Sequence, residues 1–167
     1  IVKEVVEYAT AQETAIPVIA AGGVFDGADI VKFLKLGASG VQMATRFVCT
    51  DECDVDIKFK QAYINAKKED ITIIKSPVGL PGRVLNSGFV ERVKRGETIP
   101  FKCSYRCLRS CDPKTVPFCI AKVLGDSSRG EMENAFVFAG FNAYRCTEII
   151  PVKTLVNKLK QEMLDNL

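Results

Sequence analysis

Two adjacent glycines, Gly22 and Gly23, follow the apolar run of residues 16–21 and precede Asp26. A glycine has no Cβ atom, so the backbone at this point can approach an anion closely and direct its N–H groups toward it. Asp26 is a residue type that caps helices, and the N-terminal end of a helix favours negative charge. The types and order of these residues predict a turn that binds a phosphate group.

The cysteines are a second group of residues that could take part in chemistry, and the chain has seven of them. Four of them fall within residues 103–119, namely Cys103, Cys107, Cys111 and Cys119. The spacing of the first three places them along one face of a helix predicted over residues 102–111. Four thiolates can hold zinc or an iron–sulfur cluster. No Cys-x2-Cys pair occurs, so thiols packed in a core and redox-active thiols remain alternatives.

The elements that must position the glycine turn can be read from the residues around it. Apolar residues recur at helical spacing in Ile30, Phe33 and Leu34, and Gly37 follows as a helix stop. A second strand is predicted over residues 40–47. Strand, turn, helix and strand fill about thirty residues, which is the length of one βαβ unit. Because (β/α)8 barrels bind phosphate at the loops after their last two strands, the pattern favours a barrel over other α/β proteins with a tight turn.

Residues 17–23, the pair Gly37-Ala38 and residues 41–47 together resemble the end of the flavin barrel in nitronate monooxygenases. These enzymes were formerly called 2-nitropropane dioxygenases, and flavin-dependent enoyl-acyl carrier protein reductases are their relatives. The resemblance implies an α/β fold in which the two segments are strands seven and eight of a TIM barrel. It also implies that the loops hold the phosphate of FMN through these residues: Gly22, Gly23, Gln42, Met43, Ala44 and Thr45. Ala44 stands where the family has a glycine, so a backbone contact there requires a φ that alanine tolerates.

The resemblance further implies that these residues are the C-terminal part of a larger enzyme, since a complete barrel needs roughly 250 residues. Residues 1–12 are predicted to be the helix that leads into strand seven. The family's catalytic histidine would lie outside this chain, which contains no histidine. We therefore expect the fragment to be inactive alone. Because a half-barrel has open strand edges, we also expect it to pair with the missing N-terminal half or with a second chain.

Two regions are expected, separated by a loop rich in proline and glycine at residues 76–82. Residues 1–75 would be the C-terminal portion of the FMN-binding barrel, and residues 76–167 a mostly helical extension that packs on it. The remaining predicted elements are a helix at 54–68, a strand at 71–74, and helices at 83–94, 102–111, 116–124, 131–144 and 151–164. The last helix carries an apolar face formed by Val152, Leu155, Val156, Leu159 and Met163.

Three functions follow from these observations. The first is an FMN-dependent oxidoreductase that oxidises alkyl nitronates with O2, with a small-molecule substrate. The second is an FMN-dependent enoyl-acyl carrier protein reductase that uses NAD(P)H. The third is a non-catalytic module that binds a metal through its cysteines.

Composition narrows the possible partners and location. The 167 residues are 47% hydrophobic and carry a net charge of +3, spread over scattered lysines and arginines, which argues against nucleic acid. No apolar stretch approaches the roughly 20 residues that span a bilayer, so no membrane partner is expected. Cytoplasm is the expected location.

Overall fold

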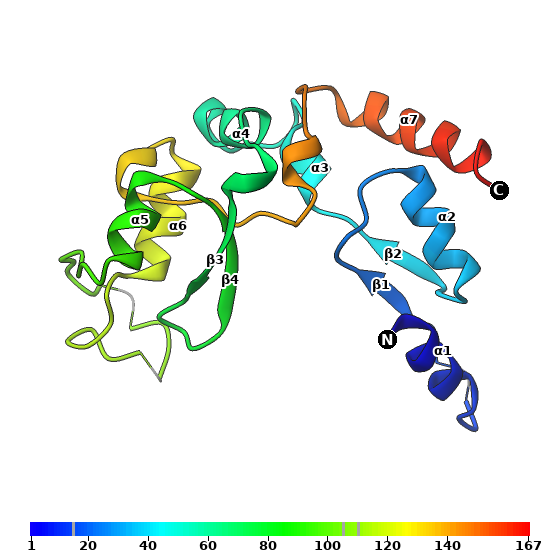
Figure 1. Cartoon of the computed structure of the whole chain (residues 1–167), viewed down its shortest axis with the longest axis horizontal. Coiled ribbons are helices and arrows are strands. Elements are labelled where there is room, and N and C mark those ends of the chain that lie inside the picture. Colours follow the sequence, from blue (N-terminus) through cyan, green and yellow to red (C-terminus); the bar gives the residue numbers. More distant parts are fainter. Residues whose placement is uncertain (15, 105, 110) are drawn as a thin grey trace. The chain divides into compact units, whose positions relative to one another are not determined.

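The computed structural model describes residues 1–14, 16–104, 106–109 and 111–167, which divide into two compact units (Figure 1). The flanking unit consists of Ile1–Cys53 together with Glu148–Leu167. The inserted unit consists of Asp54–Thr147. In sequence, the second unit therefore interrupts the first.

The flanking unit contains the predicted βαβ arrangement. Strands β1 (Ile19–Ala21) and β2 (Gly40–Gln42) are parallel and joined by helix α2 (Gly27–Lys35), while α1 (Val2–Thr10) precedes β1. In the register of the two strands, Ala21 lies opposite Gln42. The predicted helix at residues 1–12 and the connection of strand, turn, helix and strand are thus confirmed.

Helix α2 begins and ends where its sequence signals predict. The Asp26 carboxylate accepts a hydrogen bond from the Asp29 N–H at 2.9 Å, and the Asp29 carboxylate accepts one from the Phe25 N–H at 3.0 Å. These reciprocal contacts satisfy N–H groups that a helix start leaves without intrahelical partners. Gly37 follows the helix with φ +92°, the left-handed conformation that glycine adopts without strain.

The second predicted strand is shorter than expected. Strand β2 ends at Gln42, and Thr45–Val48 form the short helix α3, so the prediction of a strand over residues 40–47 was wrong beyond residue 42. The chain then reaches Thr50, which forms an isolated parallel bridge with Ile150. The Ile150 N–H donates to the Cys49 carbonyl at 3.3 Å, so the chain returns from the insertion close to where it left.

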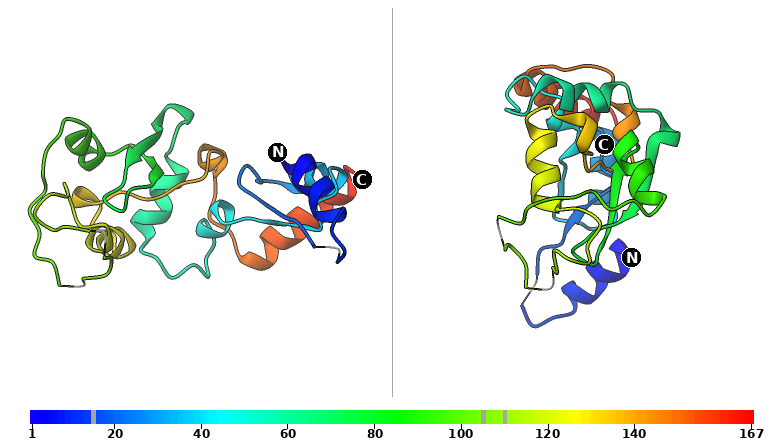
Figure 2. Two further views of the ribbon diagram at one scale, coloured as in Figure 1. Left: turned by 90° about the horizontal axis from the view of Figure 1, so that it is seen from below. Right: turned by 90° about the vertical axis from the view of Figure 1, so that its left-hand side faces the viewer.

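Helix α7 (Val152–Leu164) closes the flanking unit and lies beside α2, as the views in Figures 1 and 2 agree. Its predicted apolar face is confirmed, with Leu155 and Leu159 buried. The two helices approach closely at Gly27, where an added Cβ would lie 2.3 Å from the Met163 nitrogen. A glycine is therefore required at the first residue of α2.

The inserted unit is built on an antiparallel hairpin. Helix α4 (Ile57–Ile64) and the 3-10 helix η1 (Lys68–Asp70) lead into β3 (Ile71–Lys75), which pairs with β4 (Pro81–Leu85). Residues 136–139 extend the pairing on the other side of β4: the Leu85 N–H donates to the Val137 carbonyl at 3.1 Å, and the Ala139 N–H donates to the Arg83 carbonyl at 3.0 Å. The hairpin thus has a third, extended partner.

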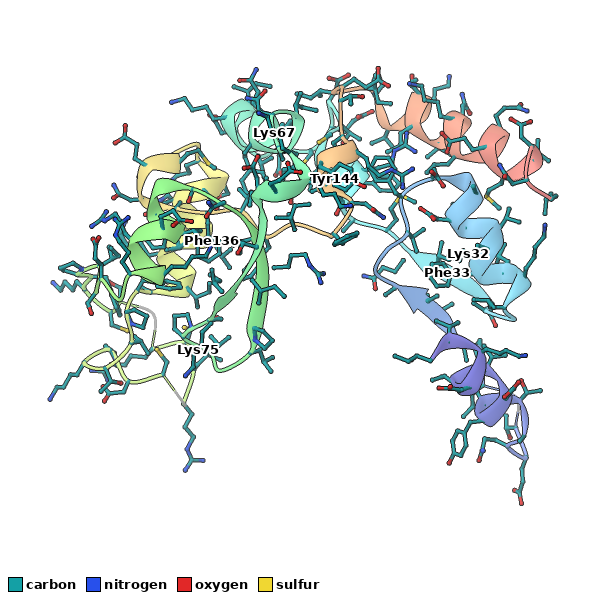
Figure 3. The ribbon with its side chains drawn as sticks, viewed as in Figure 1. Lys32, Phe33, Lys67, Lys75, Phe136 and Tyr144 are labelled. Carbon is teal, nitrogen blue, oxygen red and sulfur yellow. The ribbon has the colours of Figure 1, made fainter. Side chains whose placement is uncertain are left out.

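Helices α5 (Gly88–Lys94) and α6 (Ile120–Ser128) and an aromatic cluster complete this unit, together with the 3-10 helices η2 (Met132–Asn134) and η3 (Ala143–Arg145). The rings of Phe89, Phe118 and Phe136 lie 5.4–5.9 Å apart between centroids, and all three are almost fully buried. Figure 3 labels Phe136 among the side chains of this unit. Packing of this cluster gives the inserted unit a hydrophobic core of its own.

Several predicted helices of this region were wrong. The helix predicted at 83–94 is shortened to α5, because residues 83–85 belong to β4 and Ser87 caps the helix by accepting from the Val90 N–H at 3.2 Å. The segment predicted as a helix at 131–144 is η2, an extended segment and η3. None of the described residues between 101 and 118 lies in a helix or strand, which overturns the helix predicted at 102–111. The helix predicted at 116–124 begins later, as α6.

The expected division between residues 75 and 76 falls at the end of β3, inside the hairpin of the inserted unit. The loop rich in proline and glycine is a tight turn, in which the Gly79 N–H donates to the Ser76 carbonyl at 3.0 Å. The proline and glycine residues therefore indicate a turn and not a boundary between units. The compact units divide after residues 53 and 147.

Across the described segments, no helix combines the length and apolar character that crossing a membrane would require.

Candidate functional site

The two predicted phosphate-binding segments leave the parallel sheet at the same end. Because Ala21 and Gln42 are in register, the glycine turn follows the carboxyl end of β1 and residues 43–45 follow the carboxyl end of β2. Ligands of open parallel α/β sheets bind outside the carboxyl ends of the strands. The structure therefore brings the two halves of the predicted site to neighbouring strand ends.

The glycine turn has the conformation that a phosphate-binding turn needs. Gly22 and Gly23 have φ values of +84° and +75°, which side chains with a Cβ rarely adopt. A Cβ added to either residue would find no atom within 4 Å, so the turn faces open space. Two successive glycines with open space before them can accommodate an anion at close range.

In the segment after β2, the backbone conformation at residue 44 accepts alanine in place of the family's glycine. Ala44 has φ −124° and ψ −47°, so a side chain at this position requires no left-handed conformation. Gln42 and Ala44 are exposed, and Met43 and Thr45 are half-buried. The alanine is therefore compatible with the backbone geometry that the structure shows.

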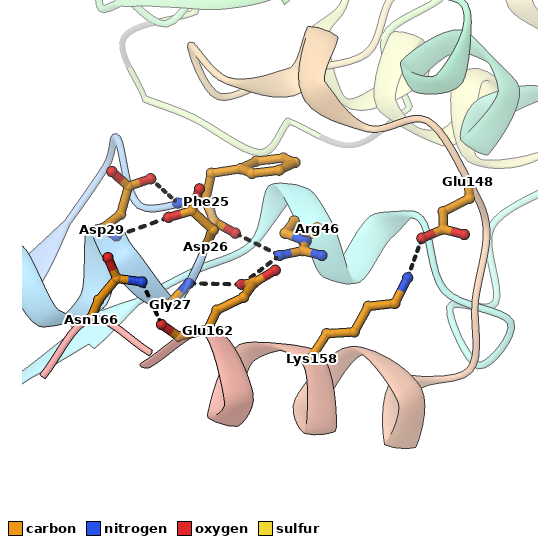
Figure 4. A network of polar contacts seen from close by, with 9 residues as sticks. All are labelled: Phe25, Asp26, Gly27, Asp29, Arg46, Glu148, Lys158, Glu162 and Asn166. Atoms are coloured by element: carbon orange, nitrogen blue, oxygen red, sulfur yellow. Dashed lines mark hydrogen bonds and ion pairs between the residues drawn. The ribbon is translucent and has the colours of Figure 1, made fainter. Parts of the chain in front are cut away.

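Carboxylates of the protein itself occupy the N-terminus of α2 (Figure 4). Besides the contacts of Asp26 and Asp29, the Gly27 N–H donates to the Glu162 carboxylate at 2.8 Å. Negative charge is favourable at a helix N-terminus, and here three carboxylates provide it. A bound anion at this helix end would therefore compete with carboxylates of the protein, which leaves the glycine turn and the segment after β2 as the predicted anion site.

Arg46 connects these elements and was missed by the sequence reasoning. Its guanidinium donates to the Phe25 carbonyl at 3.2 Å, lies 3.5 Å from the Glu162 carboxylate and stacks 4.9 Å from the Phe25 ring centroid. The side chain is only 13% exposed. One signal could have located its partner: Glu162 follows Leu159 by three residues, which places a carboxylate beside the apolar face of α7.

The four clustered cysteines line one cavity of about 380 Å³ in the inserted unit. Cys107 is exposed, Cys103 and Cys111 are half-buried, and Cys119 is buried. Burial raises the pKa of the Cys111 thiol, and the neighbouring thiols of Cys107, Cys103 and Cys119 raise that pKa further. Cys111 therefore stays protonated to a higher pH than an ordinary cysteine.

The described structure does not support the zinc or iron–sulfur site predicted at Cys103, Cys107, Cys111 and Cys119. In the described ranges, no group of three or more histidine, cysteine, aspartate or glutamate side chains could hold a metal ion. The physical reason lies in the backbone: Arg106 has φ +43°, which a helix does not allow, so the helical spacing of the thiols is lost.

The fold and the site define a parallel α/β unit with a glycine turn at the carboxyl ends of its strands, the arrangement by which TIM barrels bind phosphate. The chain belongs to the nitronate monooxygenase family, because the family model described as nitronate monooxygenase matches residues 1–162.

Similar proteins of known sequence align with about half of the chain. It is 41% identical over 83 residues to a (3aS,4S,5R,7aS)-5-hydroxy-7a-methyl-1-oxo-octahydro-1H-indene-4-carboxyl-CoA dehydrogenase of Mycobacterium tuberculosis, covering 50% of this chain and 23% of that protein. It is 39% identical over 83 residues to a probable nitronate monooxygenase of Staphylococcus aureus, with the same coverage. The alignments thus span less than a quarter of these relatives' length.

Solved structures of TIM-barrel enzymes resemble the chain over nearly all of its residues. FabK from Thermotoga maritima is 28% identical with a TM-score of 0.76, and the match covers 98% of this chain and 48% of FabK. A nitroalkane oxidase from Streptomyces ansochromogenes is 22% identical with a TM-score of 0.73, covering 99% and 43%, and at this identity it supports the fold alone. The chain spans about half the length of these structures.

Proposed function

We propose that this chain is part of an FMN-dependent oxidoreductase and that its glycine turn, with the segment after β2, holds the phosphate of the cofactor. The observation that carries the proposal is the pair of left-handed glycines facing open space at the carboxyl end of a parallel strand. When bound, FMN supplies the electron-transfer chemistry, and the protein binds and orients it. Membership in the nitronate monooxygenase family supports this assignment.

The residues of the flanking unit have separate roles in this proposal. Gly22 and Gly23 let the backbone approach the phosphate, and Gln42, Met43, Ala44 and Thr45 contribute backbone and side-chain polar groups from the neighbouring strand end. Arg46 and Glu162 do not bind the phosphate in this proposal. They fix the positions of the loop after β1 and the start of α2 through the contacts in Figure 4.

The parallel sheet supports the proposal that β1 and β2 are strands seven and eight of a TIM barrel. Parallel sheets occur almost only with both faces covered. Yet Ile19 of β1 is 57% exposed. Further barrel strands, from the N-terminal part of the full-length protein or from a second chain, would cover such a residue and complete the sheet.

The proposed reaction is oxidation of an alkyl nitronate with O2, in which a carbonyl compound and nitrite are released. The family match and the relatives described as probable nitronate monooxygenases support it. A base of the histidine type must come from outside these residues, because the chain has none, and we therefore expect the chain alone to be inactive. The second candidate is NAD(P)H-dependent reduction of an enoyl thioester, which the 28% identity to FabK favours.

Comparing FMN with riboflavin tests the phosphate site, because riboflavin carries the same ring system without the phosphate. In the full-length protein, Gly22→Ala and Gly23→Ala should each weaken FMN binding by about five- to thirtyfold, because a residue with a Cβ adopts the left-handed conformation of the phosphate-binding turn at a cost of about 1–2 kcal/mol. Riboflavin binding should change little. Flavin fluorescence quenching on titration measures both affinities.

Gly79→Ala is the matched control, since Gly79 has φ +87° and open space around its Cβ position but lies in the hairpin turn of the inserted unit. It should leave both affinities unchanged. Equal weakening of FMN and riboflavin by the variants at residues 22 and 23, or no weakening of either, would contradict a phosphate site at this turn.

Substrate choice is tested separately with FMN-loaded full-length protein. We expect nitrite release from an alkyl nitronate in the presence of O2. Oxidation of NAD(P)H that depends on an enoyl thioester, without nitrite release, would instead favour the reductase.

A further inference from the structure

The cavity lined by the four cysteines has room for a small molecule. Its volume of about 380 Å³ lies within the range of roughly 300–1,000 Å³ typical of small-molecule sites. Apolar side chains and Arg106 complete its wall: Phe101, Leu108, Pro113 and Ile120. The cavity therefore combines several thiols, an apolar surface and one positive charge.

The thiols differ in their access to solvent. Cys107 is exposed, whereas Cys111 is half-buried and Cys119 is buried. A reagent that arrives from solvent thus meets Cys107 first. Cys111 lies less exposed on the wall of the same cavity, so it meets such a reagent less readily than Cys107 does.

The described backbone near Cys107 and Cys111 departs from a helix. The Cys111 N–H donates to the Leu108 carbonyl at 3.2 Å, and Arg106, just before Cys107, has a left-handed φ of +43°. Cys107 and Cys111 both lie on the wall of the same cavity.

We propose that Cys107 and Cys111 are a redox-active pair that a small disulfide of the glutathione type converts into an intramolecular disulfide. The Cys107 thiolate attacks one sulfur of the oxidised compound, so a mixed disulfide forms and one thiol leaves. The Cys111 thiolate then attacks the sulfur of Cys107, and the second thiol leaves. The two protein thiols are oxidised, their two protons go to the departing thiolates, and one disulfide of the reagent is reduced to two thiols.

The charge of the cavity wall suits this class of reagent. Oxidised glutathione carries carboxylates, and Arg106 presents a guanidinium on the cavity that holds the two thiols. Opposite charge steers a ligand toward its site and speeds association. Replacing Arg106 should therefore slow oxidation by glutathione disulfide more than oxidation by a neutral disulfide.

Tryptic mapping can test the proposal, because each of the four cysteines lies in a different tryptic peptide. Cleavage after Lys102, Arg106, Arg109, Lys114 and Lys122 yields peptides 103–106, 107–109, 110–114 and 115–122. The full-length protein is incubated with oxidised glutathione, its remaining thiols are alkylated, and the peptides are identified by mass spectrometry. We expect two of the seven thiols of this chain to be lost and peptide 107–109 to be linked to peptide 110–114.

The variants distinguish a pair from single reactive thiols. Cys111→Ser should leave Cys107 as a stable mixed disulfide with glutathione, and Cys107→Ser should prevent modification of Cys111. Cys53→Ser is the matched control: Cys53 is half-buried like Cys111 but does not line the cavity, and its removal should leave the linked peptides unchanged. Persistence of all the thiols, or a link between any other two peptides, would overturn the proposal.

Discussion

The two units contain two short sheets whose open faces have different meanings. In the parallel pair of the flanking unit, Ile19 is 57% exposed, and in the antiparallel hairpin of the inserted unit, Ile73 is 59% exposed. An antiparallel sheet commonly has one face in water, whereas a parallel sheet is normally covered on both faces. Almost equal exposure is therefore ordinary for the antiparallel hairpin, whereas for the parallel pair it fits the proposal that further barrel strands cover it.

The two units also differ in the size of their fully buried side chains. The largest fully buried residues of the inserted unit are Phe89, Phe118 and Phe136, which pack against one another. In the flanking unit they are Leu155 and Thr50. The inserted unit thus has a core that can support its own fold, and the flanking unit depends more on contacts between helices and on polar contacts.

The largest effect is expected from removing the centre of the aromatic cluster. Phe136→Ala should lower the free energy of unfolding of the inserted unit by about 4 kcal/mol, the usual cost of truncating a buried phenylalanine. Hydrogen exchange at the Leu85 N–H, which pairs with Val137, reports this loss. Phe141→Ala, at a ring that is 51% exposed, should cost less than about 1 kcal/mol. Similar losses for both variants would contradict an independent core.

Matched substitutions on the open faces of the two sheets should differ in their effect on stability. In the full-length protein, Ile19→Thr should cost about 2 kcal/mol, because further barrel strands would bury this side chain. Ile73→Thr should cost less than about 0.5 kcal/mol, because its face stays in water. Chemical denaturation of both variants measures the difference. If Ile19→Thr were as mild as Ile73→Thr, the sheet would not continue beyond β1.

A smaller effect is expected from the polar contacts of the flanking unit. Glu162→Ala removes the acceptor of the Gly27 N–H and the partner of Arg46, and should destabilise this unit by about 1.5 kcal/mol. Lys158→Ala, on the same helix, removes only an exposed ion pair with Glu148 and should change stability by less than about 0.5 kcal/mol. Hydrogen exchange of the α2 amides measures both effects. Equal effects of the two substitutions would show that the α2–α7 contact does not need Glu162.

The smallest effect concerns the titration of one thiol. Because the pKa of Cys111 is raised by burial and by neighbouring thiols, its thiolate forms only at a higher pH than that of an ordinary cysteine. Alkylation by iodoacetamide, which requires the thiolate, should therefore reach half of its maximum rate at a higher pH for Cys111 than for a cysteine in an unstructured peptide. Coinciding pH profiles would contradict the burial of this thiol.

Local signals predicted the flanking unit well. Asp26 and Asp29 marked the start of α2, Gly37 marked its end, and the spacing of Leu155 and Leu159 marked α7. Each of these signals depends only on residues within one or two helical turns, so it can be read from the local sequence without knowing the tertiary contacts. The glycine turn and the segment after β2 were likewise found from the sequence, although their role in binding FMN stays a prediction.

The same reasoning failed where pairing across the sequence decides the conformation. Residues 83–85 were predicted to begin a helix, but β3 lies opposite them, and hydrogen bonds with residues 137 and 139 extend that sheet. The segment with Phe136 and Phe138 was also predicted to be helical, and the bridge of Phe138 to Val84 holds it extended. Arg46 was missed because its partners, the Phe25 carbonyl and Glu162, are far away in the sequence.

The return of the chain at Ile150 has a consequence for how the protein is made. Helix α7 packs on α2 only after residues 54–147 have been synthesised, which takes on the order of ten seconds at the usual rates of translation. During that interval the first strands leave the ribosome without their covering helix, and once Phe136 has emerged the inserted unit can fold around its phenylalanines before α7 is complete. The folded inserted unit would then bring the bridge partners Thr50 and Ile150 together, so that α7 packs on α2 more quickly.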